Sequence, residues 1–206
     1  MTRLLTEQEI PAAVQIIKNG GLVAFRTETV YGLAANALDP KAANKIFIAK
    51  NRPPSKQLVW QFPSVKDACA YFKGDLDRTH QEIFKTFETG LTLILPNGIG
   101  VRIPSDPISR KFLSACGIPL VVTSANTSGA PSPTTWQEVH TDLDGKIDAI
   151  IMSAPCEIGV ASTIIQLIDN SPPNAREKQL EIKIIRHGAI PPETLFNKTG
   201  LPVISE

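Results

Sequence analysis

The sequence predicts a single α/β domain built on an open, twisted, mixed β-sheet with flanking helices. Two observations support this prediction: amphipathic helical stretches alternate with short apolar strands, and no repeat or long linker divides the chain. The alternation is irregular, which favours a mixed sheet. A length of 206 residues, of which 42% are hydrophobic and 20% charged, is enough for a sizeable core without disulfides.

Capping signals mark the predicted helices. Thr6 and Glu9 have the spacing of a capping box, and the helix that follows them is expected to end at Gly20. Asp39 and Pro40 form an N-cap and first-turn pair for a helix that runs to residue 50. Further helices are expected after a second capping box at 64–67, over 76–87, and over 108–116 before a glycine.

Short apolar runs between these helices predict the strands. They cover residues 22–25, 58–60, 91–95, 100–103, 119–123, 149–152, 162–168 and 182–185. The polar segment 171–179 contains two prolines and predicts an exposed, hairpin-like loop.

The composition narrows the class of protein. The formal net charge is +1, so RNA contact would have to rest on a local basic patch. Cys69, Cys116 and Cys156 lack the spacing of zinc ligands, and we expect reduced thiols and no protein-bound metal. No stretch has the roughly 20 apolar residues of a membrane span, or the pattern of a signal peptide, so we expect a cytoplasmic protein without membrane contact.

Polar side chains follow the ends of several predicted strands. Thr27 and Thr29 flank Glu28 after one strand, Ser124 follows another, and Arg102 lies in a third. Ligand sites in open α/β sheets gather where strands end. Arg102 offers a bidentate fork for a carboxylate or phosphate. We expect Glu28 to act as a structural hydrogen-bond acceptor rather than as a catalytic base.

Three cations, Lys50, Arg52 and Lys56, lie at and just after the end of a predicted helix. One interpretation is that they only complement the helix dipole and its free carbonyl groups. The other is that three cations within seven residues bind a polyphosphate, presented by a segment stiffened by two prolines. The sequence contains no P-loop and no dinucleotide-binding glycine motif that could serve this purpose instead.

Six segments together carry a family resemblance: GGLVAFRTETVYGLAANA, KIFIAKNRPPSKQL, VRIPSDP, VVTSANTSGAPSPT, ASTIIQL and IIRHGAI. In this order they resemble the YrdC-like threonylcarbamoyl-AMP synthases. The resemblance covers residues 8–192 and leaves 193–206 as a short C-terminal tail. It implies the YrdC-like fold, with a large, concave, positively charged groove.

The resemblance implies an enzyme, a nucleotidyltransferase that makes threonylcarbamoyl-AMP and pyrophosphate from L-threonine, bicarbonate or CO2, and ATP. Mg²⁺ is expected with the ATP. The product is expected to pass to a transferase complex that modifies tRNA, and the family implies weak binding of tRNA or double-stranded RNA. The alternative is a non-catalytic paralogue that binds RNA or a nucleotide. Carbamoyl transfer, as in hydrogenase-maturation proteins, is less favoured because their accompanying domains are missing.

The resemblance also assigns roles to individual residues. Lys50 and Arg52 are the expected catalytic residues, facing the triphosphate. The threonine contacts are expected to be Thr29, Gln61, Arg102, Val122 and Ser162. The nucleotide contacts are expected to be Arg52, Lys56, Ser124, Asn126, Ser132 and Arg186. Gln61 stands where many members of the family have a histidine.

Overall fold

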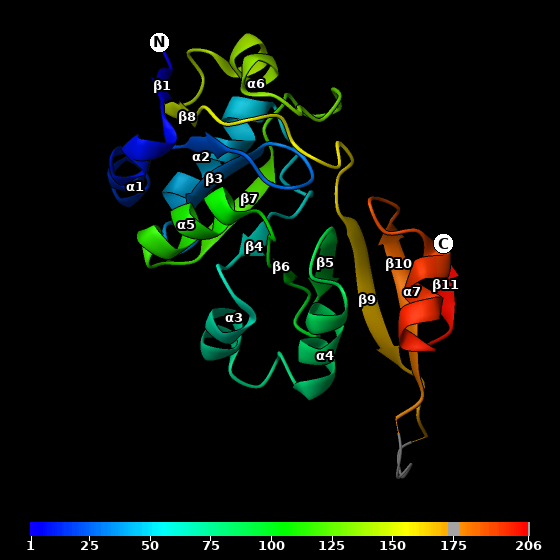
Figure 1. Ribbon diagram of the computed structural model, residues 1–206. Coiled ribbons are helices and arrows are strands. Elements are labelled where there is room, and N and C mark those ends of the chain that lie inside the picture. The colour runs from blue at the N-terminus through cyan, green and yellow to red at the C-terminus, as the bar shows by residue number, and fades with distance from the viewer. Residues whose placement is uncertain (173–177, 206) are drawn as a thin grey trace.

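Eleven strands form one mixed β-sheet in the computed structural model, which describes residues 1–172 and 178–205. The strand order is β1-β8-β2-β3-β7-β4-β6-β5-β9-β10-β11, with both parallel and antiparallel neighbours (Figure 1). This confirms the predicted α/β class and the mixed sheet. The predicted loop at 171–179 lies partly outside the described residues.

The elements have the following bounds. The helices are α1 (Ile10–Lys18), α2 (Pro40–Lys50), α3 (Val65–Phe72), α4 (Arg78–Thr86), α5 (Pro107–Cys116), α6 (Trp136–Leu143) and α7 (Pro192–Thr199), with a 3-10 turn η1 (Glu7–Glu9) before α1. The strands are β1 (Arg3–Leu5), β2 (Val23–Phe25), β3 (Gly32–Asn36), β4 (Val59–Gln61), β5 (Leu91–Ile94), β6 (Gly100–Arg102), β7 (Leu120–Ser124), β8 (Ala149–Ile151), β9 (Thr163–Asp169), β10 (Leu180–Arg186) and β11 (Val203–Ser205).

Alternation along the central strands sends side chains to two separate cores. Val23 and Phe25 of β2 pack with α1 and α5, whereas Ala24 packs on the opposite face with α2 and α6. The same division separates Ala149 from Ile150 in β8. Both faces of the central sheet are therefore covered by helices, which explains why these strands read as continuous apolar runs.

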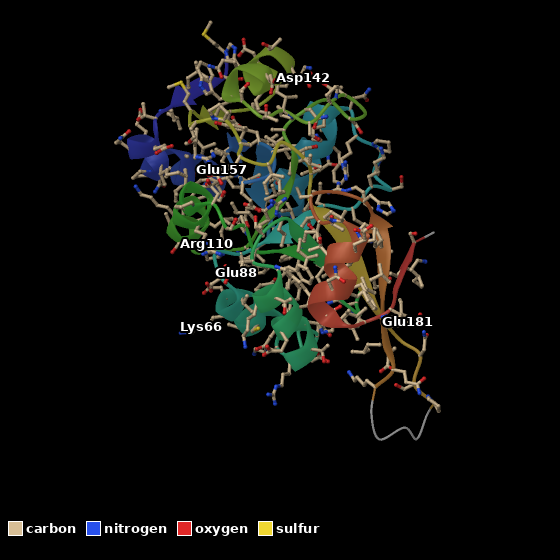
Figure 2. The ribbon with its side chains drawn as sticks, turned by 45° about the vertical axis from the view of Figure 1, so that its right-hand side comes forward. Lys66, Glu88, Arg110, Asp142, Glu157 and Glu181 are labelled. Carbon is tan, nitrogen blue, oxygen red and sulfur yellow. The ribbon has the colours of Figure 1, made fainter. Side chains whose placement is uncertain are left out.

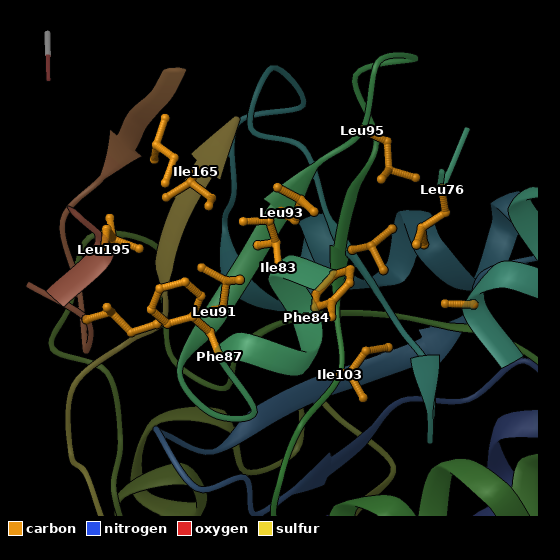
Figure 3. Packing of buried hydrophobic residues seen from close by; sticks show 14 of the residues in the cluster. Leu76, Ile83, Phe84, Phe87, Leu91, Leu93, Leu95, Ile103, Ile165 and Leu195 are labelled. Carbon is orange, nitrogen blue, oxygen red and sulfur yellow. The ribbon is translucent and has the colours of Figure 1, made fainter. Parts of the chain in front are cut away.

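A third core joins α3, α4 and α7 to the other end of the sheet. Figure 3 shows part of it, including Ile83 and Phe84 of α4 and Leu195 of α7. Phe87, which follows α4, packs in it with Leu91 of β5 and Ile165 of β9. Leu195 of α7 is fully buried in the same cluster, and β11 extends the sheet beside β10. Residues after 192 thus contribute a helix and an edge strand to the fold.

The capping predictions are confirmed in detail. Thr6 and Glu9 form the capping box, and Asp39 accepts a hydrogen bond from the backbone NH of Lys41 at the start of α2. Gly117 ends α5 with φ of 68°, a left-handed conformation that glycine adopts without steric cost. Five elements were not predicted from the sequence: β1, β3, α6, α7 and β11. Within the described residues, no helix has the length and hydropathy to cross a membrane.

Candidate functional site

A cavity of about 150 Å³ opens where the central strands meet the turn between β2 and β3. Three arginines, Arg52, Arg102 and Arg186, contribute to its lining. The other polar residues that line the cavity carry mostly hydroxyl and amide groups. Among the described residues, no Asp or Glu lines it. The cavity thus combines positive charge with neutral hydrogen-bonding groups, which suits an anionic ligand.

The turn between β2 and β3 is held by its own threonines. Thr27 Oγ1 donates to the carbonyl oxygen of Val30 at 2.7 Å and lies 3.0 Å from Thr29 Oγ1. The backbone NH groups of Ile158 and Gly159 donate to the carbonyl oxygens of Glu28 and Thr29. The segment after β8 therefore covers the outside of this turn and leaves its inner side to the cavity.

Arg26 forms ion pairs with both the segment after β8 and the N-terminus of helix α5. Arg26 Nη2 donates to Glu157 Oε1 at 2.8 Å and lies 3.3 Å from Asp106 Oδ2, at the N-terminus of α5. Glu157 is exposed and is labelled in Figure 2.

Arg102 is buried at the end of β6, and hydrogen bonds to Glu28 and Thr29 hold its guanidinium group in place. Its Nη2 donates to Glu28 Oε1 at 2.7 Å and to Thr29 Oγ1 at 2.6 Å. Its Nε is buried without a hydrogen-bond partner in the described part of the chain, as is Oε1 of Gln61. Gln61 is paired with Arg102 across β4 and β6. Arg102 and Gln61, which lie on adjacent strands and both line the cavity, therefore each keep one buried polar atom without a partner in the described residues.

The opposite wall is formed by β5, β9 and β10. Arg186 Nη2 donates to the carbonyl oxygen of Ser162 at 2.6 Å and to its Oγ at 3.2 Å. Ser162 Oγ lies 2.7 Å from Thr92 Oγ1. Desolvation and the charges of Arg102 and Arg52 lower the pKa of Arg186, which reflects how closely the three cations converge.

The two basic residues at the end of α2 have different surroundings. Arg52 lines the cavity and donates hydrogen bonds to the carbonyl oxygens of Lys56 and Gln57. Its guanidinium group contacts no carboxylate in the described residues. Lys50 is buried, and its Nζ donates to the carbonyl oxygens of Ser124 and Asn126. Lys50 thus supports the loop after β7 from beneath.

The predicted site residues divide into two groups. Those that line the cavity are Arg52, Gln61, Arg102, Val122, Ser124, Ser132, Ser162 and Arg186. Those outside its lining are Thr29, Lys50, Asn126 and Lys56, of which the first three are buried and Lys56 is exposed. Lining the cavity does not establish a role, so the roles that the resemblance assigns to both groups remain predictions.

Several lining residues were not among the predicted contacts. They include Thr27, Tyr31, Gln57, Thr92, Thr123 and Ala161. Thr92 had one usable signal, because it is the single polar residue of the apolar strand β5 and must face away from the core that holds Leu91 and Leu93. Gln57 and Ala161 carried no signal of this kind.

The fold and the cavity define an α/β protein with a cationic, hydroxyl-lined ligand site. More particularly, the chain belongs to the Sua5/YciO/YrdC family, whose profile, described as telomere recombination, matches residues 15–188. It is 36% identical over 95% of its length to a threonylcarbamoyl-AMP synthase of Pyrococcus abyssi. It is 33% identical to a putative threonylcarbamoyl-AMP synthase of Methanocaldococcus jannaschii, with 93% of each chain covered.

A solved structure of the P. abyssi protein Sua5 in complex with L-threonine has the same fold. It matches this chain with a TM-score of 0.82 and 31% identity, over 99% of this chain and 62% of that one. The chain spans 58% of the length of the P. abyssi relative and 52% of a Bacillus subtilis relative, both named threonylcarbamoyl-AMP synthase.

Proposed function

We propose that this protein is an L-threonylcarbamoyladenylate synthase, a nucleotidyltransferase that forms threonylcarbamoyl-AMP and pyrophosphate from L-threonine, bicarbonate or CO2, and ATP. The convergence of Arg52, Arg102 and Arg186 on one cavity is the main supporting observation. The names of the relatives support the same activity. In this reaction the amine of threonine captures CO2, and an oxygen of the resulting carbamate attacks the α-phosphate of ATP.

The amino acid belongs at the end of the cavity formed by Arg102 and Gln61. The unpartnered Nε of Arg102 requires an acceptor, and the unpartnered Oε1 of Gln61 requires a donor. A zwitterionic amino acid supplies both, through its carboxylate and its ammonium group. Ser162, whose hydroxyl lies 2.7 Å from that of Thr92, offers a neutral contact for the side-chain hydroxyl of threonine.

The nucleotide is assigned to Arg52 and Arg186, of which Arg186 also contacts Ser162 of the proposed amino-acid pocket. Both guanidinium groups contact only neutral oxygens in the described residues, which leaves their charge for the triphosphate. Ser124 and Ser132 lie at the same cavity and offer hydroxyl groups. Lys56 is exposed just beyond it. These residues orient the α-phosphate and neutralise charge, the two contributions that dominate catalysis of such transfers.

Mg²⁺ enters this proposal with ATP rather than as a metal of the protein. The described cavity lining contains no carboxylate, and no group of three or more His, Cys, Asp or Glu in the described residues has the arrangement of a metal site. These donors do not fit a resident Mg²⁺, which prefers carboxylate oxygens and water. The ion is therefore expected on the phosphate oxygens.

The product is expected to reach a transferase complex that modifies tRNA in the cytoplasm. Weak contact with tRNA or another double-stranded RNA is expected at a patch of four cations, Lys50, Arg52, Lys56 and Arg186. Lys50 is buried, so direct contact with RNA is expected from the other three. Binding at this patch should fall steeply as salt rises, because phosphate contacts release counterions.

Pyrophosphate release tests the proposed function. The purified protein is incubated with ATP, Mg²⁺, L-threonine and bicarbonate, and each component is omitted in turn. Release that requires both threonine and bicarbonate supports the synthase. ATP binding without threonine-dependent release would overturn it in favour of the non-catalytic paralogue.

A further inference from the structure

Glu28 is a buried carboxylate beside the cavity but outside its described lining. Its Oε1 accepts hydrogen bonds from Arg102 Nη2 at 2.7 Å and from the backbone NH of Gly90 at 3.4 Å. Its Oε2 accepts from the backbone NH groups of Ser105 at 3.2 Å and Asp106 at 3.4 Å. Backbone donors from two segments, before β5 and after β6, thus hold the carboxylate in place.

The surroundings keep Glu28 ionised at neutral pH. Burial acts to raise its pKa, but the charge of Arg102, its hydrogen bond and the NH of Gly90 act in the opposite direction. The pKa of Glu28 consequently lies below its ordinary value. A fixed negative charge therefore lies against one side of the Arg102 guanidinium.

This contact makes the three cavity arginines unequal. Arg102 is paired with a carboxylate, whereas Arg52 and Arg186 donate only to neutral oxygens among the described residues. A paired arginine keeps its geometry but loses part of its attraction for a multiply charged anion. An unpaired arginine attracts polyphosphate strongly.

We propose that Glu28 is a positioning and specificity-determining residue of the Arg102 end. It orients the guanidinium for a carboxylate and offsets enough of its charge that polyphosphate goes to Arg52 and Arg186 instead. This inference rests on the proposed function, since it assigns the Arg102 end to the amino acid.

Glu28→Gln tests the proposal, because it keeps the shape of the side chain and removes its charge. Threonine is titrated into the folded parent and variant by calorimetry, with and without inorganic tripolyphosphate as the probe. In the parent, tripolyphosphate should not displace threonine. In Glu28→Gln, threonine should bind about tenfold or more weakly, the loss of one charge-assisted hydrogen bond, and tripolyphosphate should compete with it.

Two further variants separate this role from general loss of packing. Glu28→Asp keeps the negative charge but moves it away from Arg102. Threonine should therefore bind more weakly to this variant, and tripolyphosphate should still not compete with it. Asp106→Asn alters a neighbouring buried carboxylate that contacts Ser109 and Arg26 rather than Arg102. It should lower thermal stability and leave tripolyphosphate unable to compete.

The outcomes distinguish this inference from the proposed function. A parent protein that binds no threonine overturns both. Another outcome is that the parent binds threonine while tripolyphosphate fails to displace threonine from folded Glu28→Gln. That result overturns the role of Glu28 and leaves the proposed function standing. If Glu28→Gln does not fold, Glu28→Asp provides the test. Displacement of threonine from Glu28→Asp by tripolyphosphate would also overturn the role of Glu28, because the retained negative charge should prevent this displacement.

Discussion

The ammonium group of Lys50 is buried beneath the loop after β7, where it donates hydrogen bonds to two oxygens of Asn126. One is the backbone carbonyl oxygen and the other is Oδ1, at 3.3 Å from Nζ. In return, the carbonyl oxygen of Lys50 accepts from the backbone NH of Ser128 at 2.8 Å. The end of α2 and the loop that carries Ser124 to the cavity are therefore joined by reciprocal contacts.

Stability should depend on the charge of Lys50 in a defined pH range. Desolvation, followed by the charge of Arg52, lowers its pKa from 10.5 to about 8 against the opposing effect of Asp142 on α6 (Figure 2). Between these two values the unfolded chain binds more protons than the folded one. The contribution of Lys50 to the free energy of unfolding should therefore rise with pH there, by up to about 1.4 kcal/mol per pH unit.

Urea unfolding at several pH values from 7 to 10 measures this effect. The parent should gain stability relative to Lys50→Met as the pH rises above about 8. Lys41→Met, which alters an exposed lysine of the same helix, should track the parent. A constant difference between the parent and Lys50→Met would contradict the prediction.

Arg52→Ala should weaken ATP binding without unfolding the protein. The side chain is only partly buried, and its described hydrogen bonds go to two carbonyl oxygens of the following loop. The loss of one charge-assisted contact costs about 1.5–3 kcal/mol, or about 10- to 150-fold in affinity. Lys41→Ala is the matched control. Near-normal ATP turnover by folded Arg52→Ala would remove this residue from the nucleotide site.

Arg102→Lys should cost threonine affinity more than Thr29→Val does. A single ammonium group cannot hold Glu28 and Thr29 while presenting a second nitrogen to the cavity, as the guanidinium can. Thr29→Val removes one neutral acceptor from Arg102, a loss of about 0.5–1.5 kcal/mol. Calorimetric titration with threonine ranks the two variants, and equal affinity in Arg102→Lys and the parent would refute the assignment.

Gln61→His should be tolerated or should improve threonine binding. Oε1 of Gln61 is buried without a partner in the described residues, so an imidazole nitrogen can take over the role of acceptor there. The same titration provides the measurement. A loss comparable with that of Arg102→Lys would mean that the amide makes an essential contact of its own.

Gly188→Ala should destabilise the protein and disturb the cavity. A Cβ atom at this position would lie 2.3 Å from the carbonyl oxygen of Ala161 and 2.5 Å from that of Ser162. Backbone atoms cannot move aside cheaply, and overpacking of this kind costs about 1–3 kcal/mol. Thermal unfolding and threonine titration should both show a loss.

Gly74→Ala serves as the control for this substitution. No atom lies within 4 Å of a Cβ built at Gly74. This variant should keep the stability and threonine affinity of the parent. If Gly188→Ala behaves in the same way, the close approach at Ala161 is not a constraint on the site.

Local signals in the sequence predicted most helices and strands but missed several elements. Asp39 caps α2 as predicted, because an N-cap depends only on residues a few positions apart. Strand β3 was missed because GLAAN contains no β-branched or aromatic residue. Its glycine is instead required by a distant neighbour, since a Cβ at Gly32 would lie 2.8 Å from Cγ1 of Val122.

The fold class, the family resemblance and eight of the eighteen residues that line the cavity could be predicted from the sequence alone. How deeply each of these residues is buried depends on tertiary packing. Lys50 and Arg52 are two positions apart, yet one is buried beneath a loop and the other lines the cavity. Glu28 and Arg102 meet across 74 positions of the chain. Periodicity and capping are local properties, whereas burial and ion pairing arise only when the sheet brings distant segments together.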